Sequence, residues 1–372
     1  MSKQSIVVVG GGGAGADIAR RLSAKLDITK HSLTLVTSRP FSVFLPAQLR
    51  TVVSDRGNLE KTSFIPYDKL FINNNGTVKV GKVSAVEPNT GAKGGSIVLE
   101  NGEKIHYDIL VLAPGSVWEG PLAYPDDPEQ IKEHLAFWRS KFAESNHVVL
   151  AGGGAVGVEL AGEIKDVWPK KKVTIVQGSE ELLNPTYPRK YRAFIEKQIR
   201  ARNIDIVFGD FIDEIPAVGS TTITTRNGKT FEDVLVVPTR GGRPNTAFLA
   251  SSLGNQVLNE QGQVKVRPSL QLSAYDDVFA AGDIIDWKEQ KQLAKYPVHA
   301  GVVAANILSI LSGQSPTKVY KGTFELIVLT NGANGGAGYF DVLWGIVLGN
   351  WFAKLVKSKG LMIDMKRKEL GL

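Results

Sequence analysis

Residues 5–15 read Ser-Ile-Val-Val-Val-Gly-Gly-Gly-Gly-Ala-Gly, and they are the strongest indication of the fold. Its β-branched apolar start is typical of a short buried strand. The glycines that follow predict a tight turn, and the chain then has helical character as far as Leu26. Residues 33–36, Leu-Thr-Leu-Val, predict a second strand. Strand, glycine turn, helix and strand together make one βαβ unit.

The same pattern returns about 140 residues further along the chain. Residues 147–151 predict a strand, residues 152–157 a glycine turn and residues 158–168 a helix, and the next strand follows at 173–176. Three further short apolar runs predict buried strands, at residues 109–113, 234–237 and 278–281. The chain therefore carries two separate βαβ openings.

The order of these segments predicts an α/β fold with two Rossmann-type dinucleotide-binding domains and a C-terminal α+β segment. We expect residues 1–115 and 246–315 to form a discontinuous first domain and residues 116–245 to form the second. Residues 316–372 would be the C-terminal segment. The Pro/Asp-rich stretch at 121–129 and the Gly-Gln-Ser-Pro at 313–316 are candidate linkers.

Each glycine turn has the spacing that a dinucleotide-binding turn requires. The first glycine permits a sharp reversal, the second lets the backbone approach a pyrophosphate, and the third allows helix and strand to pack closely. The phosphates would then lie at the helix N-terminus, where unpaired N–H groups point at them. The residues are Gly10, Gly12 and Gly15 in the first turn and Gly152, Gly154 and Gly157 in the second. Two dinucleotides, one permanently bound and one visiting, are what electron transfer from a nicotinamide to a flavin requires.

The residue that ends the second strand of each unit is neutral. An acid there normally holds the adenosine ribose, but the first unit has Thr37 and the second has Gln177. The ribose contacts would come from these residues or from nearby side chains such as Arg39 and Glu180. The sequence leaves open whether the hydride donor is NADH or NADPH. The presence of Glu180 and the absence of arginine at residues 177–181 slightly favour NADH.

Composition excludes several other classes of protein. Cysteine is absent, so the chain has no redox dithiol, no disulfide and no thiolate metal site. The five histidines show no metal-ligand spacing, so we expect no metal. The net charge is +7, and residues 351–372 carry six basic residues against two acidic ones. With no zinc-finger spacing and no RNP-type motif, no specific nucleic acid is expected as a partner.

The sequence resembles the two-dinucleotide-fold flavoprotein reductases, in particular the apoptosis-inducing-factor-like branch that includes ferroptosis suppressor proteins. The resemblance covers nearly the whole chain. It rests on Gly10–Gly15, Pro46-Ala47-Gln48-Leu49-Arg50, Tyr107–Gly115, Gly152–Lys165, Gly241–Thr246, Val278–Asp283 and His299–Ile307. It implies FAD in the first domain and NADH or NADPH in the second.

The resemblance also implies roles for single residues. Asp283 should hydrogen-bond a ribityl hydroxyl of FAD, Arg50 should lie beside the flavin and its phosphates, and the Val83 backbone should meet the adenine. It further implies cofactor binding by Ala113, Gly115, Gly241 and His299.

Glu159 resembles a glutamate near the meeting point of nicotinamide and flavin, although an acid in a first helical turn also suits the helix dipole. Lys357 falls where ferroptosis suppressor proteins have an active-site lysine, in a basic tail where a lysine can equally be solvated. Three residues depart from the family pattern, and they are Pro114, Arg240 and Thr37.

These features predict an FAD-dependent NAD(P)H oxidoreductase. Without cysteine, reduced FAD must pass electrons directly to a small-molecule acceptor, and the resemblance implies a quinone. Two alternatives are a signalling flavoprotein that senses NAD(P)H and a specialised oxidase or dehydrogenase acting on an organic substrate.

The C-terminal segment places apolar residues at helical spacing between Phe340 and Leu355, next to the basic tail. Such a helix would suit a membrane interface, or it would pack on the flavin domain or against a second copy in a homodimer. No secretion signal or 18-residue apolar run is visible. We therefore expect a cytoplasmic protein or one peripheral to an intracellular membrane.

Overall fold

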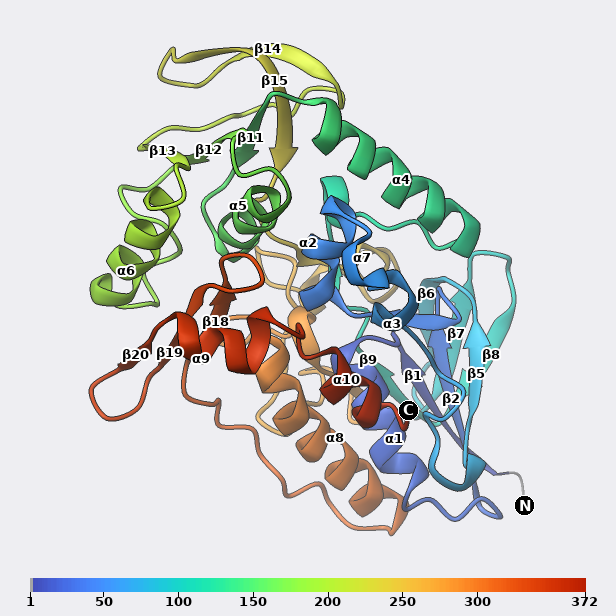
Figure 1. Cartoon of the computed structure of the whole chain (residues 1–372). Helices are drawn as coiled ribbons and strands as arrows, with labels where there is room; N and C mark the ends of the chain where they lie inside the picture. The colour runs from blue at the N-terminus through green and yellow to red at the C-terminus, as the bar shows by residue number, and fades with distance from the viewer. Residues whose placement is uncertain (1–2) are drawn as a thin grey trace.

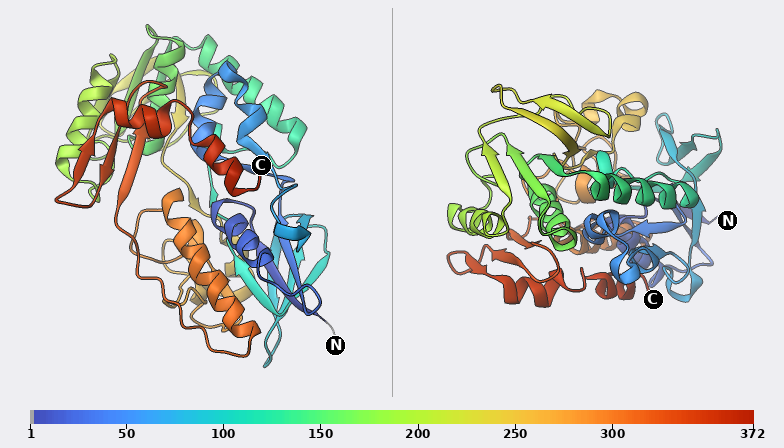
Figure 2. Two further views of the ribbon diagram at one scale, coloured as in Figure 1. Left: turned by 60° about the horizontal axis from the view of Figure 1, so that its bottom comes forward. Right: turned by 45° about the horizontal axis from the view of Figure 1, so that its top comes forward.

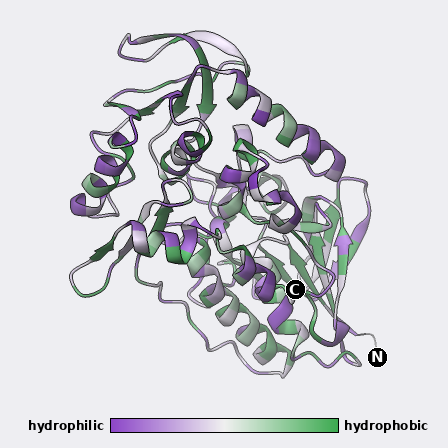
Figure 3. Cartoon of the chain, in the orientation of Figure 1, coloured by the Kyte–Doolittle hydropathy of each residue, from purple (hydrophilic) through white to green (hydrophobic). Residues whose placement is uncertain are grey.

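The computed structural model describes residues 3–372 and contains two α/β units followed by a smaller antiparallel segment (Figure 1). Each unit is built on one five-stranded sheet. Hydrophobic strands lie inside both units, and the outward sides of helices α4 and α6 are largely hydrophilic (Figure 3). The expected α/β architecture with two Rossmann-type units is confirmed.

The first sheet has the strand order β17-β9-β1-β2-β5, and all its neighbouring strands are parallel. Its strands are β1 (Gln4–Val9), β2 (His31–Thr37), β5 (Thr77–Val80), β9 (Ile109–Leu112) and β17 (Val278–Ala280). Ile6, Val7 and Val8 have no exposed surface, as expected for a parallel sheet that is covered on both faces. Because β17 follows the second unit in sequence, the first unit is discontinuous.

Helices α1 (Gly13–Ser23) and α8 (Tyr296–Leu311) pack together against the first sheet (Figure 2). A three-stranded antiparallel sheet shares the same core. Its strands are β6 (Val83–Pro88), β7 (Gly95–Leu99) and β8 (Lys104–Tyr107). Residues between β2 and β5 add β3 (Phe41–Val43), β4 (Phe64–Pro66), α2 (Leu45–Val53) and α3 (Glu60–Ser63). Helix α7 (Ala247–Leu253) packs on β6.

The second sheet has the order β13-β12-β11-β15-β14, parallel except for β14. Its strands are β11 (His147–Ala151), β12 (Lys172–Gln177), β13 (Asp205–Phe208), β14 (Ser220–Thr224) and β15 (Thr230–Pro238). Its helices are α4 (Pro128–Glu144), α5 (Ala155–Val167) and α6 (Arg189–Arg200). Asp127 caps α4 by accepting the Glu129 N–H at 2.7 Å. The segments that connect the two units pair with each other, β10 (Ser116–Val117) with β16 (Arg243–Pro244).

The C-terminal segment is an antiparallel sheet followed by short helices. It consists of β18 (Leu326–Thr330), β19 (Gly336–Phe340), β20 (Ile346–Leu348), α9 (Asn350–Ala353), a π-helical turn (Lys354–Ser358) and α10 (Ile363–Glu369). Strands β18 and β19 pack against α5 and α6 of the second unit. Leu361, Ile363 and Leu370 then join the core of the first unit, so this segment connects both units (Figure 2).

The helix expected between Phe340 and Leu355 forms only in its second half, where α9 and the π-helical turn begin at Asn350. The first half instead forms a hairpin, which turns at Leu343, Trp344 and Gly345 with φ values of 49°, 66° and 79°. Short apolar runs fit helical and strand periodicity equally well, and here the β-branched Ile346 and Val347 pair with β19. Two adjacent left-handed residues end any helical register.

In the part of the chain that the structure describes, one helical segment, Leu293–Leu311, is long and apolar enough to cross a membrane. It contains α8, which packs on α1 and buries His299, Val303 and Asn306. The side chain of Asn306 donates to the carbonyl oxygens of Ser269 and Lys318. These contacts are those of a core helix.

Candidate functional site

The first glycine turn connects β1 to α1 and forms a cradle that side chains would fill. Gly10 has a φ of 103°, and a Cβ on it would collide with the Ala113 carbonyl oxygen. A Cβ on Gly15 would collide with the carbonyl oxygen of Gly10. Gly12 is different, because no described atom lies within 4 Å of the Cβ it lacks. It is also the N-cap of α1, and its position leaves open space at the helix N-terminus where a pyrophosphate fits.

The second glycine turn repeats this geometry between β11 and α5. Gly152 has a φ of 132° and lies against the Thr239 carbonyl, while a Cβ on Gly157 would collide with Gly152 O. Gly154 caps α5 and faces space that is open among residues 3–372. The two turns therefore offer two equivalent phosphate sites, one at the carboxyl end of the central strand of each sheet.

Thr37 and Gln177 lie at the ends of β2 and β12, as their sequence positions require. Thr37 lies beside the buried Tyr67, whose hydroxyl donates to Gly11 O at 2.7 Å. Burial raises the pKa of Tyr67 to about 12, against the opposing effect of its hydrogen bonds with Thr37 and Ser42. Tyr67 therefore stays neutral, and its hydroxyl holds the first glycine turn in place through the bond to Gly11 O.

The Gln177 side chain holds the second glycine turn. Its Oε1 accepts the Gly153 N–H at 2.8 Å, and its Nε2 donates to Ser179 Oγ at 2.7 Å. Glu180 is exposed in the loop that follows. A neutral carboxamide therefore occupies the position that normally carries the ribose-binding acid.

Arg39 and Arg50, the candidate cofactor-binding arginines of the first unit, are engaged by protein groups. Arg39 donates to Pro125 O at 3.0 Å and forms an ion pair with Asp126 at 3.1 Å. Arg50 forms a bidentate pair with Glu163 of α5, with bonds of 2.7 and 2.9 Å, and donates to Ser358 O at 2.8 Å. Arg50 thereby joins α2, α5 and the π-helical turn, contacts that sequence reasoning did not foresee. Burial raises the pKa of the Glu163 carboxyl, and the hydrogen bond from Arg50 opposes this effect.

Asp283 lies in the short 3-10 turn Gly282–Ile284 that follows β17, among hydroxyl groups. It accepts from the hydroxyl of Ser116 at 2.7 Å and from the hydroxyl of Tyr296. Burial, reinforced by Asp283, raises the pKa of Tyr296 well above its ordinary value, so this hydroxyl remains a donor. Sequence reasoning missed Tyr296 and the role of Ser116, because neither belongs to a spaced motif.

His299 supports the same loop from the other side. Its Nδ1 accepts the Gly282 N–H at 3.1 Å, so Nε2 carries the proton and donates to Glu289 at 3.1 Å. Tyr320 also donates to Glu289. Burial raises the pKa of Glu289, but the hydrogen bonds from His299 and Tyr320 outweigh it and lower the pKa overall. The buried imidazole holds the backbone beside Asp283.

Of the remaining cofactor-binding candidates, Ala113, Gly115 and Gly241 lie close in sequence to the crossing between the units. Ala113 faces Gly10 through its carbonyl. Gly115 has a φ of 71°, and its carbonyl oxygen accepts the Asn245 N–H at 2.9 Å. Gly241 has a φ of 93° and lies two residues before β16. Val83 begins β6 and is partly buried. Pro114 and Arg240, which depart from the family pattern, occupy loops beside these residues.

The structure brings Glu159 and Lys357 together although 198 residues separate them. Lys357 Nζ lies 2.6 Å from Glu159 Oε1 and donates to Val328 O at 3.0 Å. The same carboxylate oxygen accepts the Thr330 N–H at 2.7 Å. The exposed fractions of the lysine and glutamate side chains are only 13% and 10%. This buried pair joins α5 to the π-helical turn and can present a fixed ammonium group to a ligand.

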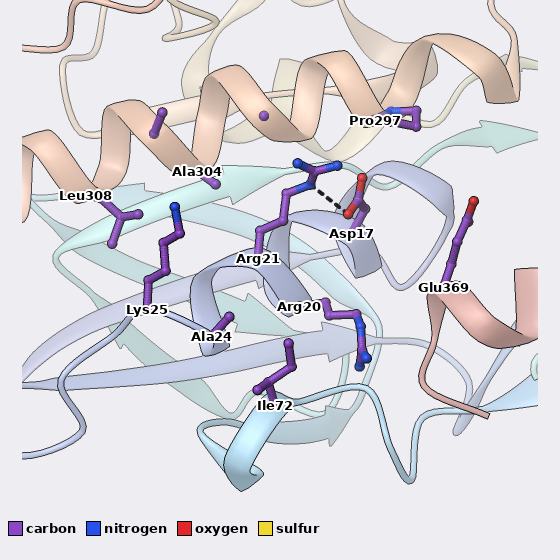
Figure 4. Close-up of a pocket in the computed structure, with 12 residues that line it drawn as sticks. Asp17, Arg20, Arg21, Ala24, Lys25, Ile72, Pro297, Ala304, Leu308 and Glu369 are labelled. Carbon is purple, nitrogen blue, oxygen red and sulfur yellow. Dashed lines mark hydrogen bonds and ion pairs between the residues drawn. The ribbon is translucent and has the colours of Figure 1, made fainter.

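A separate groove of about 460 Å³ runs between α1 and α8, outside both glycine turns (Figure 4). Asp17 and Arg21 form an ion pair of 2.8 Å along its wall. Leu308 and Ile72 contribute apolar surface. The groove is not lined by the glycine turns, by Thr37 or Gln177, or by the Arg50–Glu163 and Glu159–Lys357 pairs. Among residues 3–372, no group of three His, Cys, Asp or Glu side chains is placed to hold a metal ion.

Comparison with known proteins agrees with this geometry. The family model described as pyridine nucleotide-disulphide oxidoreductase matches residues 4–301. The chain is 48% identical to the FAD-dependent oxidoreductase FVFD30 of Flammulina velutipes over 320 aligned residues. This alignment covers 86% of this chain and 99% of that protein. It is 31% identical over 393 residues to apoptosis-inducing factor homolog B of Dictyostelium discoideum, covering 99% and 97% of the two chains. The sulfide:quinone oxidoreductase structure from Aquifex aeolicus has the same fold, with a TM-score of 0.76 at 19% identity, covering 98% and 92%.

Proposed function

Because the chain belongs to the pyridine nucleotide-disulphide oxidoreductase family, we propose that it uses NAD(P)H to reduce a quinone. The protein is an FAD-dependent NAD(P)H oxidoreductase of the apoptosis-inducing-factor-like type. The quinone is our proposal for its electron acceptor.

The two glycine turns fit the two dinucleotides of this chemistry. In the first unit, the open space at Gly12 and the hydroxyl-bonded carboxylate of Asp283 suit the pyrophosphate and the ribityl chain of FAD. In the second unit, Gly154 offers the matching space to the nicotinamide dinucleotide. When bound, FAD accepts hydride from the nicotinamide and passes the electrons on.

The buried pair of Lys357 and Glu159 is the observation that carries the proposal. The sequence contains no cysteine, so no dithiol stands between the flavin and the acceptor. Reduction of a quinone to the quinol takes up two electrons and two protons, with one proton added at each carbonyl oxygen. A buried ammonium group suits such an oxygen as a hydrogen-bond donor.

Lys357 can perform this role with its third N–H. An ammonium group has three donors, and the described contacts use two of them, to Glu159 Oε1 and Val328 O. The Glu159 carboxylate pairs with the ammonium group and fixes its direction. The third N–H can then bind a quinone oxygen and supply a proton as negative charge develops there.

A titration followed by turnover tests the proposal. The visible absorbance of the flavoprotein should bleach on anaerobic addition of NADH or NADPH, in separate cuvettes. Steady-state NAD(P)H oxidation should then rise at least about tenfold when a short-chain soluble ubiquinone is added. A rate no faster than unassisted reoxidation of the flavin by oxygen would remove the quinone from the proposal.

We further propose that the C-terminal segment contacts an anionic membrane surface, through the hairpin tip and not through a helix. The side chains of Leu343 and Trp344 are 75% and 96% exposed, although the left-handed turn that displays them costs about 1–2 kcal/mol per residue. Trp351 and Leu355 are exposed in the following helical turns, and the exposed Lys354 lies between them. Exposed tryptophan beside lysine suits a lipid headgroup region, which would place the protein peripherally on an intracellular membrane.

Trp344→Ser is expected to lower flotation of the protein with phosphatidylserine-containing vesicles by about fivefold, because the tip loses its largest apolar side chain. Ile28→Ser is the matched control, since Ile28 is 52% exposed on the first unit. Equal flotation of both variants and the wild type would refute the membrane contact. A concentration-dependent dimer that Trp344→Ser abolishes would instead assign the tip to a second copy.

A further inference from the structure

An exposed aromatic residue lies beside the carboxyl end of β12, where the second unit would hold the adenosine of the nicotinamide dinucleotide. Phe211 follows β13, and the edge of its ring fills the space where Gly178 would carry a Cβ. Gly178 directly follows Gln177, the residue at the ribose-binding position of the second unit. The Phe211 side chain is nevertheless 43% exposed. A large apolar ring that is held at this position and left open to solvent suits contact with an adenosine.

Arg226 stacks on this ring from the hairpin between β14 and β15. Its guanidinium carbon lies 4.2 Å from the centroid of Phe211, and its Nε donates to Asp213 Oδ2 at 3.0 Å. The Arg226 N–H also bonds Phe211 O at 2.9 Å. Asp210 fixes both loops by accepting the N–H groups of Phe211 and Asn227 at 2.8 and 3.0 Å. The stack is therefore held in place by the protein itself.

The charges around the stack leave one side of the arginine available. Asp213 takes the Nε and Nη2 edge of Arg226, and the Arg226 side chain is 55% exposed. A second arginine, Arg240, donates to the carbonyl oxygens of Ile212 and Asp213 and adds positive charge to the same loop. Gln177 contributes no negative charge at the ribose position. A phosphate on the ribose would therefore lie near the guanidinium group of Arg226, and residue 177 would present a neutral side chain to it.

We propose that Arg226 determines the choice of hydride donor by binding the 2′-phosphate of NADPH, while Phe211 contacts the adenosine of either donor. The inference rests on the proposed function, because it concerns the nucleotide that the second glycine turn receives. Asp213 orients the guanidinium group and partly neutralises it, which limits the preference. Arginine is suited to this role because its planar fork matches phosphate oxygens.

Equilibrium binding of NADP⁺ and NAD⁺ to the full FAD-loaded chain tests this assignment without turnover. Arg226→Gln is expected to weaken NADP⁺ binding about tenfold and to change NAD⁺ binding less than about twofold, because it removes one charge-assisted contact. Asp213→Asn should strengthen NADP⁺ binding, since it leaves the arginine charge uncompensated. Phe211→Ala should weaken both nucleotides by a similar factor.

Arg200→Gln is the matched control, because Arg200 also lies over a phenylalanine ring, that of Phe208, and also pairs with an acid, Glu196. It should leave both affinities unchanged. Equal losses for the two nucleotides in Arg226→Gln, or no loss for NADP⁺, would overturn the assignment. A wild-type chain that binds NAD⁺ but not NADP⁺ would overturn it while leaving the proposed function intact. A chain that binds neither nucleotide would overturn both.

Discussion

Lys357→Met is expected to lower the rate constant for reoxidation of the reduced flavoprotein by a soluble quinone about a hundredfold. The variant keeps the length of the side chain but removes the ammonium group that we assign to the quinone oxygen. Positioned proton donors and preorganised hydrogen bonds typically contribute factors of about 10²–10⁴. Stopped-flow absorbance measures the two half-reactions separately, and flavin reduction by NAD(P)H should change by less than about threefold.

Two variants make this test specific. Lys359→Met removes an exposed lysine two residues away and should leave both half-reactions unchanged. The double variant Glu159→Gln with Lys357→Met leaves no buried carboxylate without its partner, so it separates lost chemistry from lost stability. If the double variant folds and reoxidises at the wild-type rate, Lys357 has no part in electron transfer to the quinone.

Gly12→Ala is expected to weaken FAD binding at least about a hundredfold while the protein stays folded. The backbone of Gly12 is extended, with a φ of −73°, so alanine is compatible with it, and no described atom lies within 4 Å of the added Cβ. The methyl group would instead occupy space that a pyrophosphate needs for close approach to the backbone. The bound-flavin absorbance after gel filtration and the affinity for added FAD measure the effect.

Two other glycine-to-alanine variants serve as comparisons for Gly12→Ala. Gly15→Ala should lower thermal stability as well, since its Cβ would collide with the carbonyl oxygen of Gly10 and separate α1 from β1. Gly360→Ala places a methyl group where no described atom lies within 4 Å, far in sequence from either turn, and should alter neither property. Normal FAD affinity in a folded Gly12→Ala variant would contradict the assignment of the first turn.

The two α/β units could be predicted from the amino-acid sequence, because their signals are local. A β-branched run followed by spaced glycines and a helix specifies strand, turn and phosphate site within a few residues, and Gly10–Gly15 and Gly152–Gly157 both adopt that geometry. The absence of cysteine equally settled which redox chemistry the chain lacks. The family resemblance added Glu159 and Lys357, but it did not indicate that they touch.

Which side chains meet depends on how distant segments pack and could not be predicted from the sequence. Lys357 reaches Glu159 because β18 and β19 pack on the second unit and carry the π-helical turn to α5. Arg226 reaches Phe211 because the hairpin between β14 and β15 folds over the end of β13. Arg226 is too far in sequence from Gln177 for the strand-end pattern to have indicated it. The hairpin tip at Trp344 likewise stands in place of the first half of the expected helix, because β20 pairs with β19. Periodicity records the burial of one element at a time, whereas these contacts depend on how separate elements pack.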